Sequence, residues 1–363
     1  MKARRFVNVV TADSYLFSRI KLKTNLFYPS AAEAQHHAAA SNKKKENNTA
    51  AAEDVLRLPP SELRLKPSSR PSFTRLNYMP FYGGGEGNVL CIDDSGHTAL
   101  YDADADTVEM MPGLIGPKGC RRPISFSVAR GAGDLARAGT LYILDHVFHS
   151  RSPTPSRFEA LVYDNPNPNP SPYAGKEDHA WHWRPLPPPP VHHDSFVGCH
   201  ALLHGKDGGG GSTIYVSYCT VRDTVGTYRF DTGTGEWTKA DWRLPFFSQG
   251  VHVPELGDDL LFGIELHDPY RFCAMDIASG LKMNGAPVLR HAWLDIDEPL
   301  PEWLTGINSV AYLGDGRFCI HRRFDIMAEF GMESGVEVVR AGSKLRMIKH
   351  KSKRLDCDIE SVL

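Results

Sequence analysis

The sequence predicts an all-β fold, a β-propeller of six blades with about four antiparallel strands in each. Apolar and aromatic runs of about 5–8 residues recur along the chain, turn residues separate them, and no long stretch has helical periodicity. The runs fall into groups of about four that return every 40–50 residues or so, which is typical of propeller blades. The 26 prolines and 32 glycines also favour many turns over long helices.

The repeat is clearest in the run that we expect to form the third strand of each unit. Four such runs end in an aspartate: HTALYD at Asp102, FEALVYD at Asp164, GTYRFD at Asp231 and YRFCAMD at Asp276. A fifth unit contains GINSVAYL and DGRFCIHRRF. After three of the aspartates the chain leaves the unit through a Met-Pro or Leu-Pro pair, namely Met111-Pro112, Leu186-Pro187 and Leu244-Pro245.

The two ends of the chain supply the remaining strands. Residues 1–28 include two strand-like runs, and residues 355–363 include one more. An unclosed ring of blades would expose two open sheet edges, so we expect the N- and C-terminal strands to pair in a closing sixth blade. Residues 72–354 then hold five blades, and residues 55–71 form a linker. Five or seven blades are also compatible with the uneven spacing.

One segment stands apart from the repeat. Residues 29–54 are rich in alanine and polar residues and contain almost no large apolar side chain. Such a composition buries too little surface to offset the entropy of ordering, so we expect a disordered insert. Its His36-His37 pair and its lysines Lys43 to Lys45 are interpreted as solvated chain.

The stretch FDTGTGEW indicates the role of Asp231. Thr234 follows it by three residues and Trp237 by six. This spacing resembles the hairpin turn of kelch repeats, where aspartate and threonine bind the turn backbone and tryptophan packs between blades. The resemblance implies a structural role for Asp231 rather than a catalytic one. The pattern is degenerate, because the kelch glycine doublet is replaced here by Ser217-Tyr218.

At the scale of the whole chain a second resemblance exists. The stretches LYILD, WHWRPLPPPP and YLGDGRFCIHRRF resemble a family of uncharacterised kelch-like plant proteins, chiefly from grasses, catalogued as a domain of unknown function. The resemblance covers nearly the full chain outside residues 29–54. It implies a fold and a lineage and no activity.

The stretch VHHDSFVGCH gathers the residues that most suggest a metal site: His192, His193, Asp194 and His200. Their spacing matches neither a zinc finger nor an H-E-x-x-H motif. We therefore interpret them as residues of an exposed loop, and we expect no catalytic residue, no cofactor and no metal ligand. The alternative hypothesis is a small-ligand or metal-binding site in the central funnel, built on His192, His193 and Asp194, with hydrolysis as the activity that such a site could support.

The charge and composition of the chain narrow the classes of partner and the cellular compartment that we expect. The formal net charge of −2 and the lack of an apolar run of about 20 residues argue against nucleic acid and membrane as partners. Seven cysteines without a C-x-x-C pair favour a reducing compartment, the cytoplasm or the nucleus. The basic run at 349–354 is either an import signal or part of an outer strand. We predict a monomeric, non-enzymatic module that binds a protein partner through its loop face.

Overall fold

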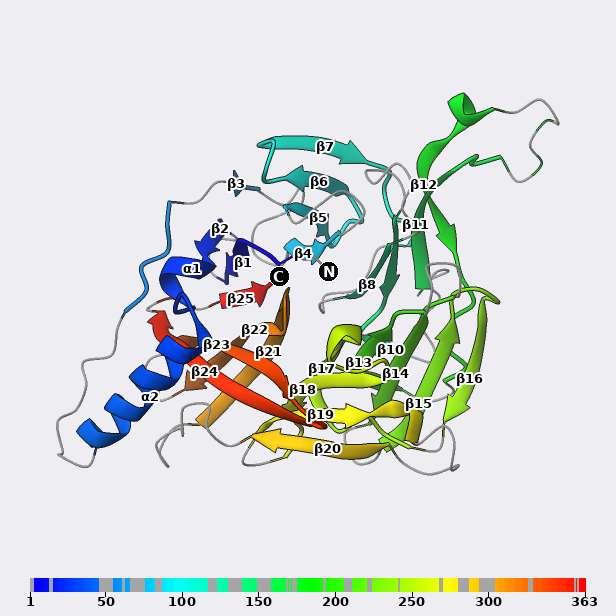
Figure 1. Ribbon diagram of the computed structural model, residues 1–363. Coiled ribbons are helices and arrows are strands. Elements are labelled where there is room, and N and C mark those ends of the chain that lie inside the picture. Colours follow the sequence, from blue (N-terminus) through cyan, green and yellow to red (C-terminus); the bar gives the residue numbers. More distant parts are fainter. Residues whose placement is uncertain are drawn as a thin grey trace. The chain divides into compact units, whose positions relative to one another are not determined.

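The 363-residue chain is seen here in a computed structural model. It describes residues 3–12, 16–45, 55–60, 63–65, 76–81, 87–116, 123–129, 139–148, 158–167, 169, 171, 175–191, 194–205, 211–220, 224–240, 242–267, 270–279, 287–293, 304–325, 329–355, 357 and 359–363. Antiparallel β-strands dominate these residues, so the prediction of an all-β fold is confirmed (Figure 1). No helix in this part of the chain is long and apolar enough to cross a membrane.

The chain divides into two compact units. The first comprises Met1–Arg64, Cys199–Ala201 and Asp241–Leu363, and the second comprises Leu65–Gly198 and Leu202–Ala240. Within each unit, strands that follow one another in the sequence pair in antiparallel fashion, as expected for sheets built from consecutive hairpins.

The second unit contains three groups of four paired strands. The first group is β4 (Leu76–Pro80), β5 (Asn88–Asp93), β6 (Thr98–Asp102) and β7 (Thr107–Met111). The next is β8 (Ile124–Ala129), β9 (Gly139–Leu144), β11 (Phe158–Asp164) and β12 (Ala180–Pro185). The last is β13 (Ser195–Leu203), β14 (Thr213–Cys219), β15 (Thr224–Asp231) and β16 (Glu236–Ala240), with the short β10 (Val147–Phe148) beside β13. A single 3-10 turn, η1 (Lys176–Asp178), precedes β12.

The first unit also has three groups of four strands. One is β17 (Phe246–His252), β18 (Leu260–Glu265), β19 (Phe272–Asp276) and β20 (Val288–Trp293), with the 3-10 turn η3 (Pro254–Leu256) between its first two strands. Another is β21 (Leu304–Gly314), β22 (Arg317–Asp325), β23 (Glu329–Ala341) and β24 (Lys344–Leu355). The third is ordered β25-β1-β2-β3, from β25 (Ile359–Val362), β1 (Phe6–Thr11), β2 (Leu16–Lys21) and β3 (Leu63–Arg64).

The strand nearest the C-terminus pairs with the strand nearest the N-terminus. Val9 lies opposite Val362 in the ladder between β1 and β25, and Leu363 exchanges backbone hydrogen bonds with Asn8. This pairing of the two ends is the one that the sequence led us to expect. Part of the expected linker, residues 55–71, joins the same sheet, because β3 pairs with β2.

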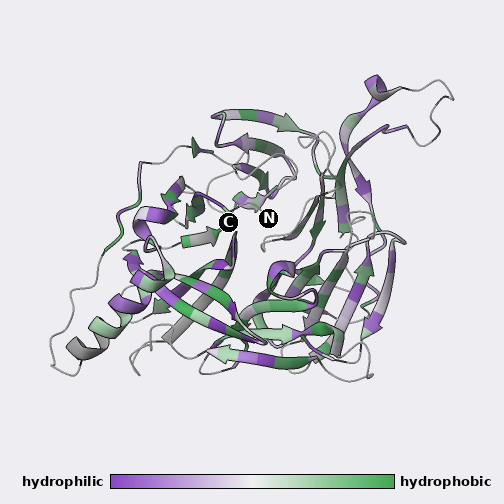
Figure 2. Ribbon diagram, viewed as in Figure 1, coloured by the Kyte–Doolittle hydropathy of each residue, from purple (hydrophilic) through white to green (hydrophobic). Residues whose placement is uncertain are grey.

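Apolar cores lie between neighbouring sheets within each unit. In β9, Leu141 and Ile143 pack into a core with the β4–β7 sheet, while Tyr142 and Leu144 pack into a second core with β13–β16. Alternate residues of a strand point to opposite faces, so β9 is buried on both. This explains its continuous apolar run, and Figure 2 shows hydrophobic residues recurring along the strands.

The segment that we expected to be disordered, 29–54, has a different structure over part of its length. Helix α2 (Ala31–Lys45) follows the short helix α1 (Leu22–Asn25) and lies along β24. The Ser30 hydroxyl accepts a hydrogen bond from the N–H of Glu33 at 3.2 Å, which caps the helix start, and Ala34 is buried. Alanine has the highest helix propensity of all residues, so the composition that suggested disorder also favours a helix.

Candidate functional site

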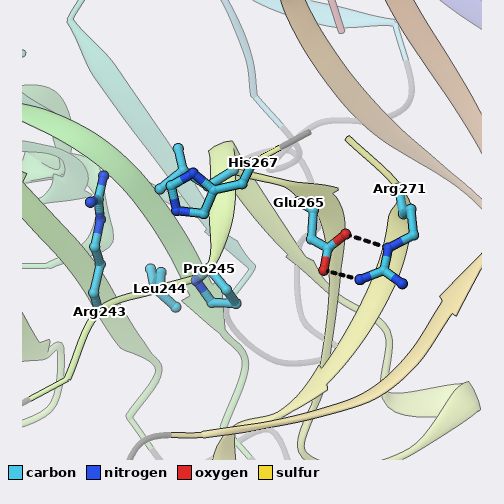
Figure 3. Close-up of a pocket in the computed structure, with 7 residues that line it drawn as sticks. Arg243, Leu244, Pro245, Glu265, His267 and Arg271 are labelled. Carbon is cyan, nitrogen blue, oxygen red and sulfur yellow. Dashed lines mark hydrogen bonds and ion pairs between the residues drawn. The ribbon is translucent and has the colours of Figure 1, made fainter. Parts of the chain in front are cut away.

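A pocket of about 230 Å³ lies in the first unit (Figure 3). Two connecting segments line it, one that leads into β17 and one that joins β18 to β19. The first segment contributes Arg243, Leu244 and Pro245, and the second contributes Glu265, Leu266, His267 and Arg271. Because adjacent strands are antiparallel, the entry to β17 and the β18–β19 connection lie at the same end of the sheet.

Backbone hydrogen bonds hold these two segments together. The N–H of Leu266 donates to the carbonyl of Pro245 at 2.8 Å and thereby ties one segment to the other. The N–H of Glu265 donates to the carbonyl of Arg271 at 2.8 Å, which closes the connection between β18 and β19. Within that connection Tyr270 has φ +52°, a left-handed conformation that non-glycine residues seldom adopt. Such conformations persist where the surrounding structure enforces them, as it often does at binding sites.

Glu265 and Arg271 form the polar wall of the pocket. The Nε and one terminal nitrogen of Arg271 donate to the two carboxylate oxygens of Glu265, both at 2.6 Å. This bidentate geometry fixes the guanidinium plane, and the hydrogen bonds to Glu265 raise the pKa of Arg271 further above its usual value. A guanidinium has five N–H donors. The three that Glu265 does not take meet no protein acceptor among the residues that the structure describes.

Arg243 lies on the side of the pocket opposite this pair, with His267 and Pro245 between them (Figure 3). The floor is apolar, because Leu244 is fully buried beside Pro245 and Leu266. The pocket therefore combines charged side chains with an apolar floor.

The three proline exits named in the sequence differ in the donor that the proline carbonyl accepts. At the first two exits a tryptophan indole N–H donates to the proline carbonyl: Trp183 to Pro112 at 2.6 Å, and Trp237 to Pro187 at 2.8 Å. At the third exit the carbonyl of Pro245 instead accepts the backbone N–H of Leu266. A backbone donor fills less space than an indole ring, and the pocket lies beside it.

Comparison with known proteins places the chain in a family. The family model described as "Protein of unknown function (DUF1668)" matches residues 4–355. The chain belongs to the DUF1668 family. No curated protein matches this DUF1668 chain. Among solved structures, the crystal structure of the uncharacterized protein lmo1340 from Listeria monocytogenes EGD-e is similar over 82% of this chain and 88% of that chain, with 10% identity and a TM-score of 0.33.

The repeated aspartates of the DUF1668 chain are structural. Asp231 Oδ1 accepts the N–H groups of Gly233 and Thr234 at 2.7 and 3.1 Å in the hairpin between β15 and β16. Asp102 accepts the N–H groups two and three residues further on in the same way. Asp276 accepts the N–H of Ser279, three residues further on, and also pairs with Arg290 on the adjacent strand, while Asp164 pairs with Arg184 on its adjacent strand. The prediction that Asp231 forms a turn is confirmed.

The histidine cluster is described only in part. His192 and His193 lie outside the described residues, Asp194 is exposed, and His200 lies in β13. In the described part of this DUF1668 chain, no group of three or more histidine, cysteine, aspartate or glutamate residues is arranged to hold a metal ion. The basic run at 349–354 lies within β24.

The structure reveals one titratable cluster that the sequence analysis missed. Glu333 is fully buried and accepts a hydrogen bond from the Cys319 thiol at 3.0 Å and one from Nδ1 of His321 at 2.7 Å. Burial, and then the charge of Glu333, raise the pKa of Cys319 well above its usual value, so the thiol stays protonated. All three side chains are buried. The spacing of Cys319 and His321, two apart on one strand, was the available signal.

Proposed function

We propose that this DUF1668 protein is a kelch-like β-propeller of six blades that binds a partner protein through a loop face and performs no catalysis. The three groups of four strands in each unit support six blades, and the pairing of β1 with β25 supports a closed ring. The Asp231 turn, with Thr234 bound at its corner, supports the kelch-like assignment.

The pocket beside Pro245 carries the functional part of the proposal. Its volume of about 230 Å³ is smaller than the roughly 300–1,000 Å³ of typical small-molecule sites. It suits a single side chain of a partner. Its lining residues belong to connecting segments fixed by backbone hydrogen bonds and by the Glu265–Arg271 pair, and recognition residues commonly lie on loops held by a rigid scaffold.

The chemistry of the pocket supports binding rather than catalysis. A general base must be oriented so that it reaches a proton of the substrate. Both oxygens of Glu265 are directed at Arg271 in a bidentate ion pair, and the Cys319–His321–Glu333 cluster is buried. We further propose that the protein is a plant protein, that it acts as a monomer, and that it functions in the cytoplasm or nucleus. The cysteines in the described part of the chain support this compartment, because none forms a disulfide.

Affinity purification of the tagged full chain from its own tissue, followed by mass spectrometry, tests the proposal. Recovered candidates are then expressed and titrated against the purified chain by calorimetry. We expect at least one partner with a defined stoichiometry and a dissociation constant in the micromolar range or tighter. If no candidate binds in the titration, the interaction module is ruled out, and a thermal-shift screen of metals and metabolites would test the funnel alternative.

A further inference from the structure

We propose that the proline-rich connection between β12 and β13 is a docking surface for a partner domain whose aromatic-lined groove binds polyproline II helices. The stretch reads RPLPPPP, from Arg184 at the end of β12 to Pro190. This inference goes beyond the proposed function, because it adds a surface in the second unit and names the class of domain that fits it. It does not depend on the pocket of the first unit.

The sequence of this connection restricts its backbone to the polyproline II conformation. A proline ring fixes φ at about −65°, and the residue before a proline is kept out of the helical region. Four residues in a row precede a proline: Leu186, Pro187, Pro188 and Pro189. None of residues 186–190 belongs to a helix or a strand. A polyproline II helix has three residues per turn, so residues three apart share a face.

Burial along the connection follows this period of three. Leu186 is half-buried against an apolar core and Pro189 is buried, so one face points into the unit. The other faces carry four exposed prolines in two pairs, Pro185 with Pro188 and Pro187 with Pro190. We call these four residues the proline ridge. Each pair has the P-x-x-P spacing that the grooves of SH3, WW and EVH1 domains recognise.

The proline ridge is held in place before any partner arrives. The N–H of Leu186 donates to the carbonyl of Phe158 at 2.9 Å, and the indole N–H of Trp237 donates to the carbonyl of Pro187 at 2.8 Å. Val191, at the far end, is buried in the core against which Leu186 packs. A segment already fixed in its bound conformation loses less conformational entropy on binding.

The chemistry of the ridge suits aromatic side chains. Prolines offer an apolar ring and a carbonyl oxygen but no N–H donor. Tyrosine and tryptophan match both features, because they combine a large apolar ring with one hydrogen-bond donor. The contact of Trp237 with the Pro187 carbonyl is an example within this chain. The one charged residue of the stretch, Arg184, is paired with Asp164 at 2.8 Å, so the ridge does not call for an acidic groove.

The fold also limits which groove can bind. In a free peptide all three faces of the polyproline helix would be open, whereas here Leu186 and Pro189 are turned toward the core. A groove that requires the Leu186 side chain would therefore bind a peptide of this sequence and not the folded chain. A groove that contacts only the proline ridge would bind both.

An array of purified SH3, WW and EVH1 domains, probed with the fluorescently labelled full chain, tests this inference. Each domain that binds is then titrated by calorimetry with the full chain and with a synthetic peptide of residues 183–191. We expect at least one domain to bind the full chain with a dissociation constant in the micromolar range. The full chain should bind at least as tightly as the peptide, because its ridge is already ordered.

Variants of the protein locate the contact. Pro188→Ala should weaken binding about tenfold, as expected when two buried methylene groups are lost from the contact. Pro166→Ala is the matched control, because Pro166 is an exposed proline of the same unit that lies outside the ridge, and it should leave the affinity unchanged. Circular dichroism and a thermal melt check that each variant is folded.

Three results would each overturn the inference: no domain of the array binds the full chain, the peptide binds more tightly than the full chain, or Pro188→Ala and Pro166→Ala have equal affinities. The proposed function fails separately. If tissue yields a partner while no domain of the array binds, the inference is overturned and the interaction module stands. If a domain of the array binds through the ridge while tissue yields no partner, the inference stands and the loop-face module is ruled out.

Discussion

Trp237 donates its indole N–H to the carbonyl oxygen of Pro187 at 2.8 Å. The donor lies in the fourth strand of one sheet, and the acceptor lies in the chain that leaves the preceding sheet. Trp183 and Pro112 repeat the contact one sheet earlier, at 2.6 Å. The Trp237 ring also packs against Phe158 and Phe230, with centroid distances of 5.5 and 5.1 Å. Each tryptophan thus joins two consecutive sheets by one hydrogen bond and one apolar contact.

Replacing Trp237 separates these two contributions. Trp237→Phe removes the hydrogen bond and should lower the free energy of unfolding by about 1 kcal/mol. Trp237→Ala also removes the ring and should cost about 2–3 kcal/mol, less than the roughly 3–5 kcal/mol for a fully buried aromatic residue, because Trp237 is partly exposed. Urea denaturation followed by circular dichroism measures both. Equal losses for the two variants would show that the ring packing contributes nothing.

Glu159 anchors the connection between two sheets. It is fully buried, and its carboxylate oxygens accept the N–H groups of Ile115 and Gly116 at 2.9 and 3.1 Å. Glu159→Ala removes both acceptors and should cost about 3 kcal/mol, whereas Glu159→Gln keeps one oxygen and should cost about half of that. The midpoint of urea unfolding reports the difference. An unchanged midpoint for Glu159→Ala would mean that water replaces the carboxylate without loss.

Two buried histidines predict a loss of stability at acidic pH. Burial lowers the pKa of His252 and of His350 below the usual value, and for His350 this outweighs the hydrogen bond to Glu337, which raises it. Nδ1 of His350 accepts the N–H of Tyr28 at 3.2 Å, so protonation would break that bond. A folded-state pKa below the unfolded value of about 6.5 means that the unfolded state binds more protons in between. The contribution of these two histidines to the free energy of unfolding is therefore fully present above about pH 6.5. It is lost as the pH drops toward the folded-state pKa.

The change of unfolding free energy between pH 7.5 and pH 5.5 tests this sign. The wild type should lose stability over this range, and His350→Gln should lose less, because Gln does not titrate. The other titrating groups are the same in both proteins and serve as the internal control. A larger loss in His350→Gln than in the wild type would contradict the assignment.

Two glycines should respond differently to the same substitution. A Cβ on Gly335 would collide with the backbone carbonyl oxygen of Leu26, which also accepts the N–H of Lys351. Backbone cannot move as a side-chain end can, so Gly335→Ala should cost about 3 kcal/mol. Gly342 has φ +62°, and no atom lies within 4 Å of the place that an alanine methyl group would take, so Gly342→Ala should cost about 1 kcal/mol from backbone strain alone. If urea denaturation gave similar losses of unfolding free energy for the two variants, the backbone at Leu26 would have to shift to make room for the new methyl group.

The strands could be predicted because their apolar runs are compatible with few structures other than a β-strand. The runs ending at Asp102, Asp164, Asp231 and Asp276 coincide with the ends of β6, β11, β15 and β19. Strands buried on both faces produce continuous apolar runs bounded by turn residues, and that signal is local. Helix α2 was not predicted, because an alanine-rich polar segment can be a disordered chain or a helix. The hydrogen bond from the N–H of Glu33 to the Ser30 hydroxyl and the packing of the helix along β24 both favour the helix.

The pocket could not be predicted, because it has no local signal. Arg243 and Arg271 are separated by two strands in the sequence, and the hydrogen bond between Leu266 and Pro245 joins the two segments that carry them. Neither arginine belongs to a motif with fixed spacing. The buried Cys319–His321–Glu333 cluster is similar in this respect, since Glu333 reaches His321 only through the register of β22 and β23.

The pairing of β1 with β25 has a consequence for biosynthesis. During translation β1 leaves the ribosome before the other strands of the described chain, and its hydrogen-bonding partner β25 leaves after them. Until then one backbone edge of β1 has no strand beside it, at a stage when exposed strand edges invite pairing with other nascent chains. Closing so long a loop also slows the final step of folding. Chaperone dependence after synthesis should therefore be greatest for versions of the chain that lack residues 359–363.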